Sequence, residues 1–200
     1  MKFRISELEK RELLKAWAAI SFAFAIAFGG GLAALVSPNF IIVFLVAGLT
    51  VGIGFIAHEL AHKVVAMRYG CWAEFRAFDQ MLMLAILFSF FGFVLAAPGG
   101  VFIKGRINKE RNGKVSAAGI VANIIVAVLF FLLAVIIPLP AVQTISLYGM
   151  LINSWLALFN LIPFMGFDGS KVLAWNKLAY AALVIMAFAL MFLSNEIVIG

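Results

Sequence analysis

The stretch His58-Glu59-Leu60-Ala61-His62 lies near the C-terminal end of an apolar run from Phe40 to Met67. Residues four positions apart share one face of a helix, so both imidazoles can bind one zinc ion while Glu59 flanks its open coordination position. The chain contains two histidines, both in this pentapeptide. The alternative is a pair of helix histidines satisfied by neighbouring groups. It is disfavoured because ionisable residues are costly inside a membrane helix and usually mark a functional site. The pattern therefore predicts the metal-plus-base arrangement of a zinc hydrolase.

The composition indicates a lipid environment. Of 200 residues, 66% are hydrophobic and 12% are charged, and apolar surface on this scale must face lipid. We expect an all-α polytopic protein of the cell membrane, with residues 1–200 forming one transmembrane domain whose catalytic core covers about 40–175. The net charge of +6 does not indicate nucleic acid binding, because basic residues that flank spans normally report orientation.

Several segments are long and apolar enough to cross a bilayer. The expected spans are Ala16–Val36, Phe40–Met67, Ser116–Ile137, Ala141–Ile162 and Lys177–Leu193. The segment Met81–Ala97 is apolar over about 17 residues, at the lower limit for a span, so it either crosses or re-enters. Ser6 followed by Glu9 is typical of a capping box, which predicts a helix that starts there and runs into the membrane.

The distribution of basic residues decides between these two paths. If Met81–Ala97 re-enters, all 15 Lys and Arg fall on one side, which the positive-inside rule makes cytoplasmic. If it crosses, the basic residues of the following loop would lie outside, and Asp168 would lie on the opposite membrane face from His58. We therefore predict five spans plus a re-entrant segment. The N-terminus is then cytoplasmic and the site lies in the membrane near the cytoplasmic face.

A catalytic zinc ion usually takes three protein ligands and keeps a fourth position for water. Most candidate acids lie in charged interfacial or terminal segments, where a solvated carboxylate costs little. Asp168 instead follows a break at residues 163–166 and lies at the membrane depth of His58 in this topology. We expect it to be the third ligand of one zinc per chain. Two alternatives remain: Asp168 as a helix N-cap for the last span, and Cys71 as an extra ligand instead of an ordinary buried residue.

Glu59 then has the role of general base and acid. Zinc lowers the pKa of its bound water, and a carboxylate within reach can take that proton and pass it to a leaving amine. Asn123 and Asn160 are uncharged donors within spans, suited to hold a substrate backbone or a developing oxyanion. Alternatively, they join helices. Pro98-Gly99-Gly100 leads into a short strand-like segment that ends in a basic loop.

Three motifs occur in a specific order: His58-Glu59-x-x-His62, Gly119-x-x-x-Asn123 and the stretch from Asn160 to Gly169. With them the chain resembles the site-2 protease family, zinc metalloproteases that cut transmembrane substrates within the bilayer. The resemblance covers roughly Leu45 to Lys171. The chain differs from many members at Ile120, where they have proline. The form of the family that it resembles is a short one without PDZ or CBS domains.

The resemblance implies a role for each matched residue. Three would bind zinc: His58, His62 and Asp168. Glu59 would be the catalytic acid and base, Asn160 would assist substrate or oxyanion binding, and Asn123 would line the site. The residues Gly100, Val101, Phe102 and Ile103 would belong to the family's membrane-associated β element, which pairs with an unwound substrate. An edge strand can supply backbone partners to an opened helix.

These residues leave three candidate functions. The first is an intramembrane zinc endopeptidase acting on a single-span membrane protein. The second is a zinc-binding transporter or sensor, which has no evident need for the non-ligand acid Glu59. The third, a purely structural helical protein, would have to explain why three ionisable groups converge at one depth. The sequence does not indicate the substrate or the oligomeric state.

Overall fold

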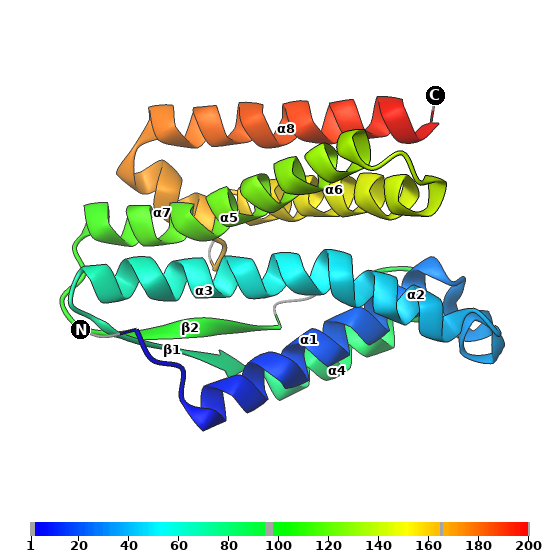
Figure 1. Ribbon diagram of the computed structural model, residues 1–200. Coiled ribbons are helices and arrows are strands. Elements are labelled where there is room, and N and C mark those ends of the chain that lie inside the picture. Colours follow the sequence, from blue (N-terminus) through cyan, green and yellow to red (C-terminus); the bar gives the residue numbers. More distant parts are fainter. Residues whose placement is uncertain (1–2, 95–97, 165, 200) are drawn as a thin grey trace. The chain divides into compact units, whose positions relative to one another are not determined.

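The computed structural model describes residues 3–94, 98–164 and 166–199. The chain divides into two compact units: Ala57–Trp72 with Ile103–Gly200, and Lys2–Ile56 with Ala73–Phe102. We call them the α5 unit and the α1 unit, after a helix that each contains (Figure 1). Helix α3 (Ile53–Arg68) begins in the α1 unit and continues into the α5 unit.

The α5 unit is a helical bundle. Besides the later part of α3 it contains α5 (Lys109–Ile136), α6 (Pro140–Asn160), α7 (Asp168–Trp175) and α8 (Lys177–Ile199). Helices α5 and α6 lie side by side after a short connection (Figure 1). Pro140 opens α6, where the missing N–H of proline costs nothing. The buried core of the bundle consists of Ile120, Ile124, Ala157, Leu161, Val172, Leu183 and Ala187.

The break after α6 is held by a close backbone contact. A Cβ atom on Gly169 would lie 2.7 Å from Cα of Leu161, so a larger residue could not pack there. The Tyr180 hydroxyl donates to the Leu161 carbonyl over 2.9 Å. The first contact sets the start of α7, and with it Asp168, against the end of α6, and the second ties α8 to the same place.

The α1 unit combines helices with a small sheet. Its elements are α1 (Glu7–Phe28), the 3-10 helix η1 (Gly31–Val36), α2 (Phe40–Ala47), the π-helical turn η2 (Gly48–Gly52), β1 (Trp72–Ala77), α4 (Asp79–Ser89) and β2 (Gly99–Lys104), of which the two strands extend slightly past its boundaries. The Ser6 side chain accepts from the Glu9 N–H over 3.0 Å, which confirms the predicted helix start. The Glu9 carboxylate also accepts from the Phe75 N–H of β1.

Glycine allows α1 to approach the helix that follows it. Cβ atoms on Gly48 and Gly52 would collide with the Trp17 ring, in the first case at 2.6 Å. The indole N–H donates to the Gly48 carbonyl over 3.0 Å, at the π-helical turn where the regular backbone hydrogen bonds are shifted. The two glycines at this spacing thus leave room for α1 beside this helix.

The structure contains four helices long and apolar enough to cross a membrane among the described residues. They are Phe40–Arg68, Lys109–Ile136, Pro140–Asn160 and Lys177–Ser194. The expected span Ala16–Val36 is not one helix: α1 ends at Phe28, and Gly30 and Gly31 adopt positive φ angles of 89° and 74° before η1 begins. Glycine populates that region readily, so the Gly29–Gly31 run breaks the helix.

Two further expectations concern residues 69–100. The helix α4 (Asp79–Ser89), which overlaps Met81–Ala97, has 11 residues, about 17 Å, which is too short to cross a core of about 30 Å. Residues 95–97 of that segment lie outside the described residues. The strand-like segment is confirmed as β2. Its partner β1 was not predicted.

Candidate metal centre

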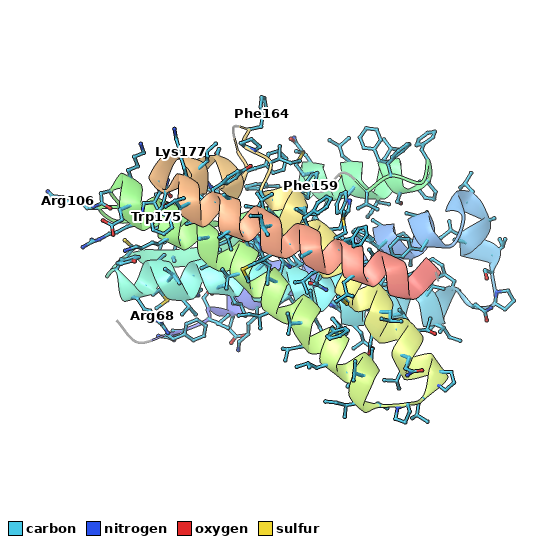
Figure 2. All side chains as sticks on the ribbon, turned by 90° about the horizontal axis from the view of Figure 1, so that it is seen from above. Arg68, Arg106, Phe159, Phe164, Trp175 and Lys177 are labelled. Atoms are coloured by element: carbon cyan, nitrogen blue, oxygen red, sulfur yellow. The ribbon has the colours of Figure 1, made fainter. Side chains whose placement is uncertain are left out.

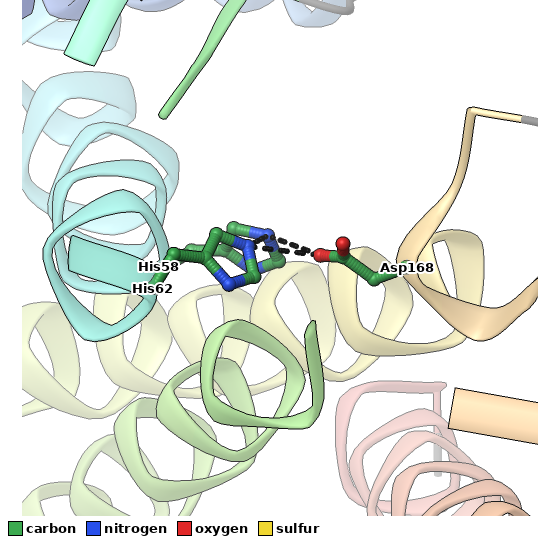
Figure 3. Close-up of side chains that lie close together, drawn as sticks. All are labelled: His58, His62 and Asp168. Atoms are coloured by element: carbon green, nitrogen blue, oxygen red, sulfur yellow. Dashed lines mark hydrogen bonds and ion pairs between the residues drawn. The ribbon is translucent and has the colours of Figure 1, made fainter. Parts of the chain in front are cut away.

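The predicted ligands come together in the α5 unit (Figure 3). His58 and His62 lie one turn apart on α3, and Asp168 is the first residue of α7. The distance from Nε2 of His58 to Nε2 of His62 is 2.9 Å. Asp168 Oδ2 lies 3.3 Å from the first of these nitrogens and 2.9 Å from the second. All three residues are buried.

The outer ring nitrogens fix which atoms face the centre. Nδ1 of His62 lies 2.8 Å from the carbonyl oxygen of Val115, which can only accept, so this nitrogen carries the proton. Nδ1 of His58 lies 2.7 Å from Asn123 Oδ1, and donates in the same way. Both Nε2 atoms of the neutral rings therefore present lone pairs to each other and to a carboxylate oxygen.

Such a set of acceptors fits a metal cation. Three converging acceptor atoms without a donor repel one another unless a cation lies between them. Two His nitrogens and one carboxylate oxygen are a usual ligand set for catalytic zinc, and tetrahedral zinc sets its ligand atoms about 3.3 Å apart, close to the observed 2.9–3.3 Å. The residues present can thus hold one zinc ion.

Asp168 divides its two oxygens between two partners. Oδ2 faces the imidazoles, and Oδ1 pairs with Nζ of Lys171 over 3.1 Å. The interpretation of Asp168 as the N-cap of the last span is wrong, because Asn176 has that role and accepts from the N–H groups of Leu178 and Ala179.

Asn123 supports His58 from behind. Its oxygen binds the His58 ring, and its Nδ2 donates to Asn153 Oδ1 over 3.3 Å. Asn153 in turn donates to the Gly149 carbonyl over 2.8 Å. Both asparagines are fully buried. Asn123 therefore holds the His58 ring from α5 and links α5 to α6, which is the joining role considered for it, while its predicted role in substrate binding stays a prediction. Sequence reasoning assigned nothing to Asn153, although an Asn within an apolar span is itself a signal.

Gly119 makes room for both imidazoles. A Cβ atom at this position of α5 would lie 2.5 Å from Nε2 of His62 and 2.7 Å from Cε1 of His58. Any side chain here would push into the rings, so glycine is required for α5 to pass this close to α3. The motif Gly119-x-x-x-Asn123 thus contributes both the space for the two imidazoles, at Gly119, and the amide that contacts His58, at Asn123.

Glu59, which is adjacent to His58, has an incompletely hydrogen-bonded carboxylate. It is 8% exposed, and its Oε2 has no hydrogen-bond partner among the described residues. A buried carboxylate oxygen without a partner costs free energy.

Other predicted residues lie elsewhere. Asn160 ends α6, and its amide donates to the Leu156 carbonyl over 2.9 Å, so its role stays a prediction. The residues Gly100–Ile103 lie on β2, and their role in binding peptide also stays a prediction. Cys71 is buried and does not belong to the metal-binding group found among the described residues.

Two acids differ from the expectation of solvated carboxylates. Glu9 is completely buried and Glu74 is 8% exposed. Both take part in contacts between the start of α1 and β1, two segments that are distant in the sequence. Their burial therefore has a structural cause that is separate from the metal centre.

Two proteins of Methanocaldococcus jannaschii are similar to this chain. One, named "Putative zinc metalloprotease MJ0611", is 40% identical over 183 residues that cover 90% of each chain. The other, zinc metalloprotease MJ0392, is 27% identical over 123 residues, which are 59% of this chain and 30% of that protein. No model of a known protein family matches, and neither does a solved structure. The extent of the first similarity, together with the buried His-His-Asp group, means that the chain belongs to the same family of zinc metalloproteases as MJ0611.

Proposed function

We propose that this protein is an intramembrane zinc endopeptidase of the site-2 protease type, which hydrolyses a peptide bond in the transmembrane segment of a membrane-protein substrate. The observation that carries the proposal is the buried group His58, His62 and Asp168 on a chain with four membrane-length apolar helices. A metal site on such helices can act on a bond that water-soluble proteases cannot reach. The family membership supports the metalloprotease part of the proposal.

The chemistry divides between the metal and Glu59. Zinc held by the three ligands supplies an activated water and a polarised carbonyl. Glu59 takes the proton of the attacking water on its carboxylate and delivers it to the leaving amine. Its unpartnered Oε2 supports this role, because that oxygen is not already committed to a structural hydrogen bond. Asn123 keeps His58 in the tautomer that a ligand needs.

Substrate binding is assigned to β2 and Asn160. The described residues form a two-stranded sheet, so β2 can offer its backbone to an extended peptide. A transmembrane helix must unwind before its carbonyl can be attacked, and pairing with a strand compensates the hydrogen bonds it loses. Asn160 would contribute an uncharged donor to the substrate backbone or the oxyanion.

The proposed topology places the site near the cytoplasmic face. Arg68, Arg106 and Lys177 gather with Trp175 at one end of the α5 unit (Figure 2), where α3 ends and α5 and α8 begin (Figure 1). Three cation–π contacts lie at this end: Lys104 with Trp72, Arg111 with Tyr69 and Lys114 with Trp175. Basic and aromatic residues are typical of a cytoplasmic membrane interface. We propose that α1 with η1 forms a fifth crossing and that α4 re-enters.

The proposal is tested with purified protein in proteoliposomes that contain a mixture of single-span membrane proteins. Mass spectrometry should locate new N-termini within the transmembrane segments of some of these proteins. Glu59→Gln should lose this cleavage by roughly 10²- to 10⁴-fold, the usual contribution of a general base, while it retains one zinc per chain. The matched control is Glu110→Gln, which changes an exposed acid on α5.

Two outcomes would contradict the proposal. Cleavage at an unchanged rate by Glu59→Gln would remove the assigned base. New N-termini confined to water-exposed loops would leave a metalloprotease that does not act inside the membrane. Zinc binding without cleavage of any protein in the mixture, by the wild type as well, would favour a transporter or sensor.

A further inference from the structure

The first turns of α1 lie along one edge of strand β1. Glu9 Oε1 accepts from the backbone N–H of Phe75, and Glu12 Oε2 accepts from that of Ala77, each over 3.0 Å. The two acids are one helical turn apart, and the two N–H groups belong to alternate residues of the strand. A third contact, between the Ser6 hydroxyl and the Glu74 carboxylate, ties the start of the helix to the same strand.

The register of the sheet shows which edge these carboxylates occupy. The N–H of Phe78 donates to the carbonyl of Pro98 over 3.0 Å just past the strand ends, and Lys104 lies over the ring of Trp72 at the other end. The strands β1 and β2 are therefore antiparallel. In such a pair, alternate residues direct their backbone groups to the partner and those between direct theirs away.

It follows that the N–H groups of Phe75 and Ala77 point away from β2. They are the groups that a third strand would bind on the outer side of β1, and the two carboxylates already occupy them. On β2 the corresponding outward residues are Val101 and Ile103. Because the described residues contain a sheet of two strands, no further strand covers that second edge.

The contacts on β1 resist displacement. Glu9 is completely buried, and the Glu12 side chain is 18% exposed. Glu12 also pairs with Lys15 over 3.0 Å, and Lys15 pairs with Asp79 at the start of α4 over 2.6 Å. Hydrogen bonds from a charged acceptor are stronger than those between neutral groups. A peptide that entered on this side would have to take two N–H groups from carboxylates that lie partly or wholly out of water.

We propose that Glu9 and Glu12 close the outer edge of β1, so that an extended peptide can pair with this sheet along β2 alone. The inference rests on the proposed function, because it concerns how a substrate backbone would join the sheet. It assigns a role in substrate specificity to α1: the helix replaces a strand on one side and thereby fixes the side and register of peptide entry. The closure of β1 also prevents this edge from pairing with a strand of another copy.

The closure is tested first without any substrate, by amide hydrogen exchange in detergent. In the wild type the N–H groups of Phe75 and Ala77 should be protected. Glu9→Met with Glu12→Met keeps the side-chain length but removes the acceptors, and exchange at both amides should rise at least roughly tenfold. Glu9→Gln with Glu12→Gln is the matched control, because the amide oxygen still accepts, and protection should remain.

Folding of the variants is checked by zinc content, which should stay at one per chain. If the double Met variant loses its zinc, the single Glu12→Met variant replaces it, because the Glu12 side chain is less buried than that of Glu9. Faster amide exchange is then expected at Ala77 alone. Unchanged exchange at Ala77 in a folded Met variant would overturn the proposal.

The direction of peptide entry is tested by cross-linking. A photoreactive p-benzoylphenylalanine replaces Phe102 on β2 or Trp72 on β1, which are 50% and 37% exposed. The probe is a synthetic single-span peptide with a helix-breaking Gly-Pro pair at its centre. In the otherwise wild-type protein, cross-links should form from position 102 and be at least roughly tenfold weaker from position 72, and the Met variants should raise those from position 72.

Equal cross-linking from both positions of the otherwise wild-type protein would overturn the proposal. Cross-linking from neither position would overturn its peptide-pairing part, even with the exchange result as expected. Proteolysis is measured in its own assay with Glu59→Gln, so a failure of the closure is distinguishable from a failure of the proposed function.

Discussion

In the α1 unit the buried carboxylate of Glu9 accepts a hydrogen bond from a backbone N–H of β1. In the α5 unit Asp168 Oδ2 instead faces two imidazole nitrogens, and Glu59 Oε2 has no partner among the described residues. Glu9 is thus paired with the backbone of the folded chain, whereas Asp168 Oδ2 belongs to a group of atoms that can bind a metal ion. Substitutions in the first region should therefore change the sheet, and those in the second should change ligand binding.

The largest effect in this comparison is expected for Asp168→Ala. The substitution removes one of three ligands, and a site of two histidines should bind zinc more than roughly 100-fold more weakly, beyond the range seen for residues that only support ligands. Zinc affinity is measured by competition with a chelator in detergent. Glu9→Ala should keep its zinc and lower stability by about 1–3 kcal/mol, because it leaves a buried N–H unpaired.

Retention of full zinc affinity by Asp168→Ala would show that another residue completes the site. A loss of zinc by Glu9→Ala in a protein that remains folded would show that the two regions are coupled, and the distinction drawn between them would fail.

Gly119→Ala should produce the next largest effect. The new Cβ would lie within 2.7 Å of atoms of both imidazoles, and overpacking of this kind costs about 1–3 kcal/mol. Since the displaced groups are the ligands, the loss should appear as zinc affinity and approach roughly 100-fold. Gly113→Ala is the matched control on the same helix, because its Cβ would press on Trp175 instead. It should lower the melting temperature and leave zinc affinity unchanged.

Asn123→Ala should weaken zinc binding by roughly tenfold or somewhat more, the lower part of the range for partners of metal-bound histidines. The His58 ring would lose the acceptor for its Nδ1 proton and with it a preference for one tautomer and orientation. Asn153→Ala removes only the next partner in the line and should have a smaller effect. An equal loss in both variants would indicate that the pair joins helices without orienting His58.

The ligands were predictable from sequence because each carries a local signal. Four-residue spacing places two histidines on one helix face, and a carboxylate after a broken helix stands out in an apolar chain. Partners that depend on packing carry no such signal. Which face of α6 meets α5 is set by tertiary contacts, so Asn153 could not be assigned to Asn123.

The sheet illustrates the same limit. The strand β2 follows a Pro-Gly-Gly turn signal and was predicted, whereas β1, which carries charges at Glu74 and Arg76, was not. What makes β1 a strand is the pairing with β2 and the carboxylates of α1, all distant in sequence. The helix break at Gly29–Gly31 could likewise not be predicted, because glycine permits a turn without requiring one.

Lys171 offers the smallest and most selective test of the metal centre. Its Nζ holds Asp168 Oδ1 at 3.1 Å while Oδ2 faces the imidazoles, so the lysine orients the carboxylate to present one oxygen. The lysine side chain is 39% exposed, and solvent weakens ion pairs of this kind to about 1 kcal/mol or less. Lys171→Met should therefore weaken zinc binding only a few-fold. Lys171→Arg should restore it, because the guanidinium can reach the same oxygen.

The ratio between these lysine variants separates orientation from packing. Methionine keeps most of the length of the side chain and loses the charge, so a packing role would leave zinc affinity unchanged in both variants. A loss of 100-fold or more in Lys171→Met would contradict the exposed ion pair and would mean that Lys171 neutralises the centre itself. A few-fold loss with rescue by arginine would mean that Lys171 orients Asp168 as Lys15 orients Glu12 in the α1 unit. In both residues one carboxylate oxygen pairs with a lysine, but in Asp168 the second oxygen is left for the metal.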